Sequence, residues 1–481
     1  MTDATQQPAQ LFIGGAWRAP SGDGAIPVHN PSTGEILSYV ADATEQDGIA
    51  AVDAAAAAAA GWAATPARKR AEILRKCFEL ITRDAESLAR LISLENGKAL
   101  KDARGEVAYA AEFFRWFSEE AVRIQGDFSV APSGANRILV QYQPIGVSLL
   151  ITPWNFPAAM ATRKIAPALA AGCTCVLKPA TETPLTAYAV ARLLAEAGVP
   201  DGVVNVITTS RNAEVTNAML DDPRVRKLSF TGSTNVGRIL LRKAADQVIH
   251  SSMELGGNAP FIVFDDADLD KAIEGAMIAK MRNGGSACTA ANRLYVQRGI
   301  AAAFTERLTE RMRALRVGPG VEETTDCGPL VNAATANKVA DLVDDAVSKG
   351  AKALCGGKRP DGQGHYYLPT VLSDVPDNAR IVREEIFGPV APIYVFDTEE
   401  DVIARANDTE YGLVAYVFTQ DVARGLRVSE RLEAGMLALN RGLVSDPAAP
   451  FGGVKQSGLG REGAHHGMLE FMESKYIATD W

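Results

Sequence analysis

The sequence predicts an α/β fold with two parallel-sheet domains, and three observations support this. Apolar strand-like runs alternate with helical stretches from Val147 to about Ala438, which is the pattern of a parallel sheet covered by helices. The length of 481 residues fits two or three domains. With 47% hydrophobic and 22% charged residues, the composition is that of a globular protein and unlike that of a fibrous or disordered chain.

The first half of the chain begins with helices and then changes its pattern. Residues 41–125 read as helical, including the alanine-rich run 50–60 and the stretch 68–90, where apolar side chains recur at helical spacing. Residues 137–142 alternate between polar and apolar, as an exposed strand does. Strands and helices then alternate between Val147 and Ala245, and we expect this part to form the first parallel sheet.

The second half contains another α/β block. It opens with the apolar run 261–264, includes a strand at 293–296 and a helix at 300–315, and ends near Ala438. The last segment, 450–481, is rich in glycine at first and finishes in a β-like run at 474–478. Because this tail has little core of its own, we expect it to pair with a neighbouring subunit.

Charge and composition exclude several kinds of protein. The net charge is −9 and no basic block is present, so nucleic acid is not an expected partner. Pro153, Asn155, Arg163 and Lys164 interrupt the most apolar region, so no run is long enough to cross a membrane. The polar start, residues 1–10, shows no targeting signal, and we expect a cytoplasmic protein. The six cysteines lack disulfide-scaffold or zinc spacing, so we expect reduced thiols and no metal site.

One segment has the features of a phosphate-binding loop. Residues 230–237 end a strand and open a helix, and Gly232 and Gly237 would let a ligand approach the backbone closely. The backbone N–H groups at the start of the helix, after Ser233, are free and would suit a pyrophosphate. An ordinary helix-entry turn is the alternative. Because Arg238 and Ile239 follow the second glycine, a P-loop nucleotide site is not expected.

Three further residues are candidates for chemistry. Cys288 lies among small residues, where a substrate could reach its thiol. Glu254 is a carboxylate in an apolar segment, and a raised pKa there would suit a general base. Asn155 follows a predicted strand and could donate to an oxyanion. Each has a structural alternative, namely a buried thiol, a salt-bridged surface carboxylate and a proline-bounded turn.

Taken together, five segments resemble, in order and spacing, the signature segments of the aldehyde dehydrogenase superfamily. They are Trp154-Asn155-Phe156-Pro157, Phe230-Thr231-Gly232-Ser233, Glu254-Leu255-Gly256-Gly257, the loop around Cys288 and Glu385-Ile386-Phe387-Gly388-Pro389. The resemblance covers nearly the whole chain. It implies a cofactor-binding domain (1–122 and 145–256), a catalytic domain (257–445), and a small β oligomerisation element with the C-terminal tail (123–144 and 446–481).

The resemblance also implies a cysteine-based oxidation that uses NAD or NADP. Cys288 would attack the aldehyde, and the Asn155 side chain and the Cys288 N–H would stabilise the oxyanion of the thiohemiacetal. Glu254 would activate the water that hydrolyses the thioester, so the product would be a free acid. The cofactor residues implied by the resemblance are Trp154, Gly232 and Ser233 at the pyrophosphate, Lys178 and Glu385 at ribose hydroxyls, and Phe387 at the nicotinamide end.

Thr181 bears on the choice between the two cofactors. It stands where NAD-restricted relatives often carry a glutamate. A small hydroxyl leaves room for a 2′-phosphate, which a carboxylate would repel. We therefore expect NADP to be accepted, and both cofactors are consistent with this position.

The subfamily that the sequence resembles most is succinate-semialdehyde dehydrogenase. The likeness is carried by segments 159–164, 280–283 and 442–445. In that subfamily the matching arginines and serine hold the distal carboxylate of the substrate, which implies this role for Arg163, Arg282 and Ser445. The forked donors of a guanidinium match two carboxylate oxygens. The alternative is that the two arginines pair with buried carboxylates of the protein.

The sequence departs from the subfamily pattern at three places. Ala290 stands where many members carry a second cysteine, so no local disulfide can form, and Ser286-Ala287 replaces the commoner Gln-Thr. Arg441 stands where relatives usually have a small or uncharged residue. An inward Arg441 would add a third cation and fit glutarate semialdehyde, a hydroxylated semialdehyde or sulfolactaldehyde. An outward Arg441 would bridge to a neighbouring subunit.

A catalytically silent relative that only binds cofactor is the hypothesis from another class. Loss of Cys288, Glu254 or Asn155 would support it, but all three residues are present, so we expect an enzyme. Relatives pair through the segment near 126–142 and the terminal strand. A homodimer or homotetramer acting on a small anionic aldehyde is therefore expected.

Overall fold

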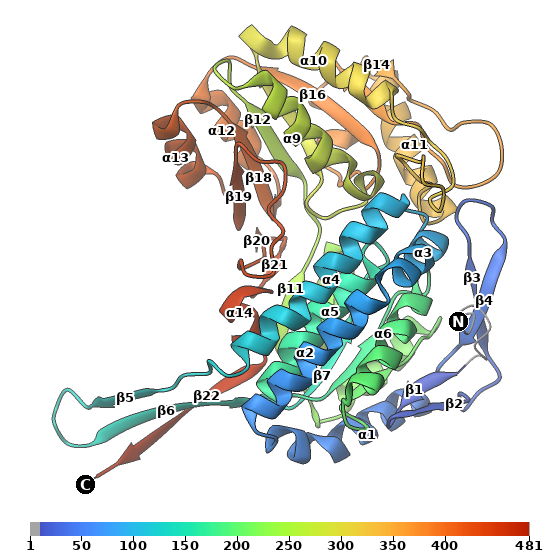
Figure 1. Cartoon of the computed structure of the whole chain (residues 1–481). Coiled ribbons are helices and arrows are strands. Elements are labelled where there is room, and N and C mark those ends of the chain that lie inside the picture. The colour runs from blue at the N-terminus through green and yellow to red at the C-terminus, as the bar shows by residue number, and fades with distance from the viewer. Residues whose placement is uncertain (1–9, 481) are drawn as a thin grey trace.

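Two α/β domains and a projecting β-arm make up the chain (Figure 1). The computed structural model describes residues 10–480. Residues 1–9 lie outside the described residues. They make up most of the polar segment 1–10, in which the sequence shows no targeting signal. In that described part, no helix is long and apolar enough to span a membrane.

The first domain is built on an eight-stranded sheet with the order β2-β1-β9-β8-β7-β10-β11-β21. Strands β7 to β11 are parallel, as predicted, but β1, β2 and β21 add antiparallel edges. The strand order reverses between β7 and β10, and ligands bind at the carboxyl ends of strands at such a point. The strands are β1 (Leu11–Ile13), β2 (Ala16–Arg18), β7 (Val147–Ile151), β8 (Cys175–Lys178), β9 (Val204–Val206), β10 (Val225–Thr231), β11 (His250–Glu254) and β21 (Gly458–Leu459).

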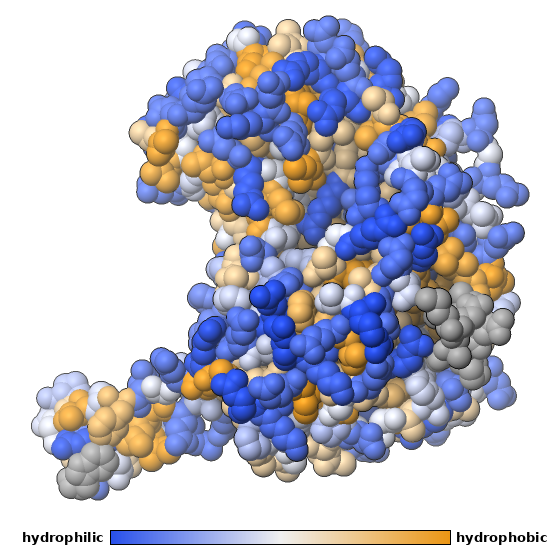
Figure 2. Space-filling view, viewed as in Figure 1, coloured by the Kyte–Doolittle hydropathy of each residue, from blue (hydrophilic) through white to orange (hydrophobic). Residues whose placement is uncertain are grey.

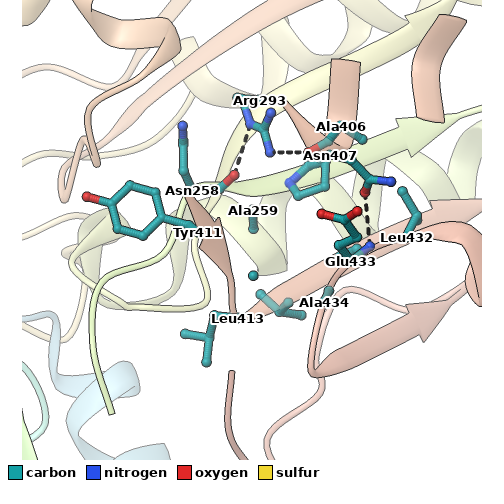
Figure 3. Close-up of a pocket in the computed structure, with 14 residues that line it drawn as sticks. Asn258, Ala259, Arg293, Ala406, Asn407, Tyr411, Leu413, Leu432, Glu433 and Ala434 are labelled. Carbon is teal, nitrogen blue, oxygen red and sulfur yellow. Dashed lines mark hydrogen bonds between the residues drawn. The ribbon is translucent and has the colours of Figure 1, made fainter. Parts of the chain in front are cut away.

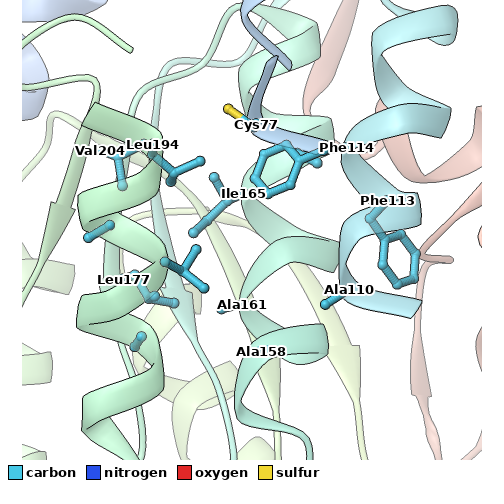
Figure 4. Packing of buried hydrophobic residues seen from close by; sticks show 14 of the residues in the cluster. Cys77, Ala110, Phe113, Phe114, Ala158, Ala161, Ile165, Leu177, Leu194 and Val204 are labelled. Carbon is cyan, nitrogen blue, oxygen red and sulfur yellow. The ribbon is translucent and has the colours of Figure 1, made fainter. Parts of the chain in front are cut away.

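Eight helices cover this sheet. They are α1 (Glu45–Ala63), α2 (Ala67–Arg83), α3 (Ala85–Asn96), α4 (Leu100–Glu120), α5 (Pro157–Ala171), α6 (Pro184–Ala197), α7 (Asn212–Asp221) and α8 (Thr234–Ala245). Helix α5 is buried over its whole length, because its many alanines let α2, α4 and α6 approach on all sides. Figure 4 shows Ile165 of α5 between Phe114 of α4 and Leu194 of α6. Truncating one such buried phenylalanine costs about 3–5 kcal/mol, so α5 is a rigid support.

The second domain has a seven-stranded sheet with the order β14-β15-β16-β13-β12-β18-β19. Only β14 is antiparallel to its neighbour. The strands are β12 (Ala259–Val263), β13 (Ala291–Gln297), β14 (Lys352–Cys355), β15 (Thr370–Ser373), β16 (Val390–Phe396), β18 (Val414–Phe418) and β19 (Met436–Leu439). The helices are α9 (Leu269–Met281), η2 (Arg282–Gly285), α10 (Arg298–Arg313), α11 (Ala333–Ser348), η3 (Arg380–Val382), α12 (Glu399–Asn407) and α13 (Val422–Arg431).

The arm is a three-stranded antiparallel sheet in which β22 (Met472–Thr479) pairs along its length with β6 (Arg137–Pro144), next to β5 (Asp127–Val130). It extends away from both domains (Figure 1), and Figure 2 shows apolar side chains near its end. A separate hairpin joins β3 (Ala25–His29) to β4 (Ile36–Ala41).

The segment 446–471 packs against both domains, whereas the sequence predicts a tail with little core of its own. Its β20 (Val454–Lys455) pairs with β17 (Tyr411–Gly412) of the second domain, and β21 pairs with β11 of the first. Helix α14 (Ala464–Leu469) then packs on α4 and α5. Glycines make this path possible, since a Cβ on Gly458 would lie 1.9 Å from the Met253 carbonyl oxygen. Only β22 of the predicted tail therefore belongs to the arm.

Candidate active site

A cavity of about 210 Å³ lies between the two domains at the carboxyl ends of β7 and β10. Residues from both domains line it. Seven of the predicted site residues are among them: Trp154, Asn155, Gly232, Ser233, Cys288, Glu385 and Phe387. The structure thus brings together the nucleophile candidate and most of the predicted cofactor residues.

The end of the cavity at α8 suits an anion. Ser233 is the N-cap of α8, and its hydroxyl accepts a hydrogen bond from the Val236 N–H at 3.4 Å. A Cβ on Gly232 would lie 2.4 Å from the Phe230 ring, so this position needs glycine. The helix start offers free N–H groups and the positive end of its dipole. This geometry fits the predicted pyrophosphate position.

Near Cys288 the cavity is aromatic and acidic. The Phe387 and Trp154 rings meet edge to face with centres 5.2 Å apart. Phe387 has a φ of 58°, a left-handed conformation that costs energy for a residue with a side chain. Glu385 Oε1 accepts a hydrogen bond from the Gly257 N–H at 3.1 Å. A phosphate-binding helix end, an aromatic wall and a carboxylate together fit a nicotinamide dinucleotide.

Lys178 is the last residue of β8 and Thr181 follows the strand, and neither residue lines the cavity. Lys178 Nζ donates to Asn212 Oδ1 at 2.6 Å, and burial lowers the pKa of Lys178 to about 8. The Thr181 hydroxyl donates to Glu182 Oε2 at 3.3 Å, and Glu182 Oε1 accepts from Asn332 Nδ2 at 3.3 Å. A carboxylate that the sequence interpretation overlooked therefore lies directly beside Thr181.

Cys288 lies on the short loop between η2 and β13 and is partly buried. Asn283, Gly284 and Gly285 have φ values of 54°, 56° and 78°, so the chain makes a left-handed turn before the cysteine. A Cβ on Gly285 would lie 2.1 Å from the Gly388 carbonyl oxygen, which fixes glycine there. Burial raises the pKa of Cys288 to about 12, and the Arg163 and Arg282 guanidiniums oppose this rise. The resting group is a thiol that needs a base.

Asn155 follows β7, and hydrogen bonds to its backbone carbonyl hold it in place. Its carbonyl oxygen accepts hydrogen bonds from Lys98 Nζ at 2.6 Å and from Asn283 Nδ2 at 2.7 Å. Its side-chain Nδ2 donates to the Ser286 carbonyl at 3.2 Å, which links Asn155 to the loop of Cys288. An amide has two N–H donors, so one remains for a ligand in the cavity.

Glu254 is the last residue of β11 and is buried. Its Oε2 has no hydrogen-bond partner among residues 10–480. Burial raises the pKa of Glu254 well above its usual range, and the nearby Glu462 carboxylate adds to this rise. A carboxylate in this state can take up a proton near neutral pH.

Glu462 is a buried residue of the site that the sequence analysis missed. It forms ion pairs with Arg163 and with Lys164 Nζ, the latter at 2.6 Å. Lys164 also donates to Ser229 Oγ at 2.9 Å. Lys164 could have indicated such a buried carboxylate, because a lysine in the buried helix 157–171 needs a carboxylate partner. Nothing in the glycine-rich segment 446–471 indicated which carboxylate that is.

The predicted substrate residues Arg163, Arg282 and Ser445 lie close to the thiol, outside the cavity lining. Arg282 Nη1 donates to Ser445 Oγ at 3.3 Å, and its guanidinium lies 4.8 Å from the Phe156 ring centre. The Arg163 guanidinium lies 4.1 Å from the ring centre of Phe451. Cations held against aromatic walls suit an anionic ligand. Arg163 also fits in part the alternative that it pairs with a buried carboxylate of the protein, because its ion pair with Glu462 neutralises some of its charge.

Arg441 is the remaining predicted substrate residue, and it does not line the cavity at Cys288. It is exposed, and its Nε donates to the Leu443 carbonyl at 3.0 Å. The preceding Asn440 has a φ of 53° and is fixed by hydrogen bonds to the Thr419 backbone, so the chain turns outward at Arg441. Arg441 lines a surface cavity of about 360 Å³ beside β19, and Ser445 lines the same cavity.

Other parts of the second domain offer little room for a ligand. A hollow near Arg293 (Figure 3) holds only about 10 Å³, enough for one water at most. There the Arg293 guanidinium donates to the carbonyl oxygens of Asn258, Arg405 and Ala406, so it joins β12, β13 and α12. Within residues 10–480, His, Cys, Asp and Glu form no group of three that could hold a metal ion.

Comparison with known proteins agrees with this geometry. A model of the aldehyde dehydrogenase family matches residues 17–477. A succinate-semialdehyde dehydrogenase of Paenarthrobacter nicotinovorans is 55% identical over 442 residues, which are 92% of this chain and 98% of that protein. A glutarate-semialdehyde dehydrogenase of Pseudomonas aeruginosa is 49% identical over 477 residues, 99% of each chain. A crystal structure described as an E. coli NADP-dependent enzyme superposes with a TM-score of 0.98 at 49% identity, covering 100% of both chains. With its cavity, its cysteine loop and these matches, the chain belongs to the aldehyde dehydrogenase family.

Proposed function

We propose that this protein oxidises a short aldehyde with a distal carboxylate to the free acid, using NAD or NADP, and that succinate semialdehyde is its substrate. The observation that carries the proposal is the placement of Arg163 and Arg282 next to the Cys288 thiol, with Arg282 bonded to Ser445. A semialdehyde bound at the thiol by its carbonyl would extend its carboxylate to these donors. The relative with a succinate-semialdehyde name supports the same class.

The first step is addition of Cys288 to the aldehyde carbon. Because burial keeps the thiol protonated, a base must take its proton as the C–S bond forms, and Glu254 is the buried carboxylate nearby. The carbonyl oxygen becomes an oxyanion. The remaining Asn155 N–H and the Cys288 backbone N–H stabilise that charge in a low-dielectric site.

The second step is loss of hydride from the same carbon, which leaves a thioester on Cys288. A nicotinamide dinucleotide, when bound, would supply the hydride acceptor. Trp154 and Phe387 would orient it, and Ser233 at the start of α8 would hold its phosphates. Once Glu254 has released the thiol proton to solvent, it removes a proton from water and the resulting hydroxide adds to the thioester carbon. The C–S bond then breaks, the Cys288 thiolate takes the proton back from Glu254, and the free acid leaves.

Glutarate semialdehyde is the second candidate, because the Pseudomonas relative of that name is 49% identical over almost the full chain. Sulfolactaldehyde depends on an inward Arg441, and the exposed Arg441, whose Nε donates to the Leu443 carbonyl, does not support it. The silent-relative hypothesis stays unsupported, since Cys288, Glu254 and Asn155 are assembled at one site.

We also propose that the protein is a homo-oligomer that pairs through its arm. The exposed Val130, Tyr476 and Ile477 lie on the three-stranded sheet that extends from the two domains. The cytoplasmic location stays a prediction.

The test is to trap the thioester. Glu254→Gln keeps the size of the side chain but removes the base of both steps, so acylation and hydrolysis should both slow. After long incubation with succinate semialdehyde and cofactor we expect a succinyl group on the peptide that contains Cys288, measured by mass spectrometry, that outlasts the one on the unmodified enzyme. In the unmodified enzyme, hydrolysis should speed up as pH rises through the raised pKa of Glu254 and slow as pH falls, because only the ionised carboxylate accepts a proton. Cys288→Ala should show no adduct. An adduct on another residue, or unchanged turnover by Glu254→Gln, would contradict the assignment.

A further inference from the structure

Tyr109 of α4 is a buried hydroxyl next to the two arginines that the reaction itself does not need. Its oxygen is shielded from solvent and interacts with the Arg163 side chain, but its proton has no acceptor among residues 10–480. A buried hydroxyl proton without an acceptor is rare in native structures and calls for a reason.

The ring of Tyr109 is held firmly. It packs edge to face on Phe113 with ring centres 4.8 Å apart, and the Arg282 guanidinium lies 5.8 Å from its centre. The charges of Arg163 and Arg282 both act on the hydroxyl. Helix α4 is in turn fixed against the buried α5, which carries Arg163.

Several donors meet at this point. Arg163 pairs with Glu462 through Nε, and its Nη2 makes no well-formed hydrogen bond within residues 10–480. Arg282 makes one weak bond, to Ser445 Oγ at 3.3 Å. Burial raises the pKa of Tyr109, so its proton is retained and can be donated. Donors from three side chains therefore converge here, and Glu462, which pairs with Arg163, is the carboxylate of the protein that acts on the same hydroxyl.

We propose that Tyr109 donates its O–H to the distal acid group of the substrate, beside Arg163 and Arg282, and so helps to select anionic aldehydes. This inference rests on the proposed function. A neutral aldehyde of the same length offers no acceptor and leaves the hydroxyl unpaired. Sites built to hydrogen-bond a polar group discriminate strongly against analogues that lack it.

The test compares Tyr109→Phe with a matched control, Tyr394→Phe. Tyr394 is also buried with an unpartnered hydroxyl, but it packs in the core of the second domain. Both changes remove one oxygen and keep the ring. For Tyr109→Phe we expect kcat/KM with succinate semialdehyde to fall about 10-fold or more, mainly through KM, because the lost bond is to a charged group. Butanal oxidation should change little, and Tyr394→Phe should leave both substrates unaffected.

Binding of succinate gives a second readout that does not depend on turnover. The unmodified protein and Tyr394→Phe should bind succinate alike in calorimetry, and Tyr109→Phe should bind it about 10-fold more weakly. If the protein fails to oxidise succinate semialdehyde but shows this difference in succinate binding, the proposed function fails while the acid-binding role of Tyr109 stands. Equal losses with butanal, unchanged succinate binding, or no succinate binding by the unmodified protein would each overturn the inference.

Discussion

At the residue scale, we expect Glu182 to influence the choice of cofactor. Thr181 has a small side chain, as the sequence indicates, but its hydroxyl is bonded to Glu182, whose carboxylate also contacts Asn332 of the second domain. A negative charge at this place would repel the 2′-phosphate that Thr181 leaves room for. The carboxylate therefore offsets part of the tolerance that Thr181 provides.

Glu182→Gln tests this effect. The change keeps the hydrogen-bonding shape and removes the charge, so we expect the ratio of kcat/KM with NADP to that with NAD to rise by about fivefold or more, as loss of a like-charge contact allows. Dissociation constants of the two nucleotides, measured by quenching of tryptophan fluorescence, should shift in the same direction. Glu196→Gln, an exposed carboxylate on α6, is the control. A ratio that moves equally in both variants would remove Glu182 from cofactor selection.

At the scale of elements, α4 and α5 are joined by a buried carboxylate that also positions Asn155. Glu106 Oε1 accepts hydrogen bonds from the Ala158 and Ala159 N–H groups at the start of α5, at 2.8 and 3.2 Å. Its other oxygen pairs with Lys98 Nζ at 2.5 Å, and Lys98 donates to the Asn155 carbonyl. One carboxylate thus caps a helix and holds the oxyanion residue.

Glu106→Ala is expected to destabilise the protein by about 3–5 kcal/mol, because it leaves the buried Lys98 charge without its partner. Glu79→Ala removes the exposed partner of Arg75 and should cost about 0–1 kcal/mol. Urea unfolding of both variants measures the difference. A small loss for Glu106→Ala, similar to that for Glu79→Ala, would show that the pair does not support the site.

The sequence predicts the elements in which apolar residues recur at a regular spacing. The helices of 41–125, the alternation from β7 to α8 and the strands β6 and β22 were all expected, since each is long enough to show its spacing. The two-residue strands β20 and β21 have no period to read, so the crossing of 446–471 between the domains was missed, and Glu462 with it. The sequence leaves both orientations of Arg441 open, because the direction of the chain there depends on a left-handed Asn440, which sequence spacing does not reveal.

At the scale of the whole molecule, the arm exposes apolar side chains far from either core. Val130 is 50% exposed and Tyr476 is 58% exposed. Neither can be covered by its own domains, because the arm extends away from them (Figure 1). A second copy of the chain is the partner we propose for this surface.

Val130→Asp would place a charge on that surface without changing the strand pairing within the arm. We expect it to shift the protein toward a smaller species in light scattering after size-exclusion chromatography, since burying an unpaired charge in an interface is costly. Val347→Asp on α11 is a matched control at an exposed valine of the second domain. If both variants keep the assembly of the unmodified protein, or if that protein is itself a monomer, the arm is not the contact.

The most direct test of the whole account is kcat/KM for succinate semialdehyde beside butanal, with the unmodified enzyme and with Arg282→Ala, followed by reduction of NAD and NADP. Contact of the distal carboxylate with Arg163 and Arg282 should give succinate semialdehyde a lead of about 100-fold or more, which is about 2.7 kcal/mol of transition-state preference. Arg282→Ala should lose most of that lead and keep its activity on butanal. Equal kcat/KM for the two aldehydes in the unmodified enzyme would contradict the proposed acid-binding site.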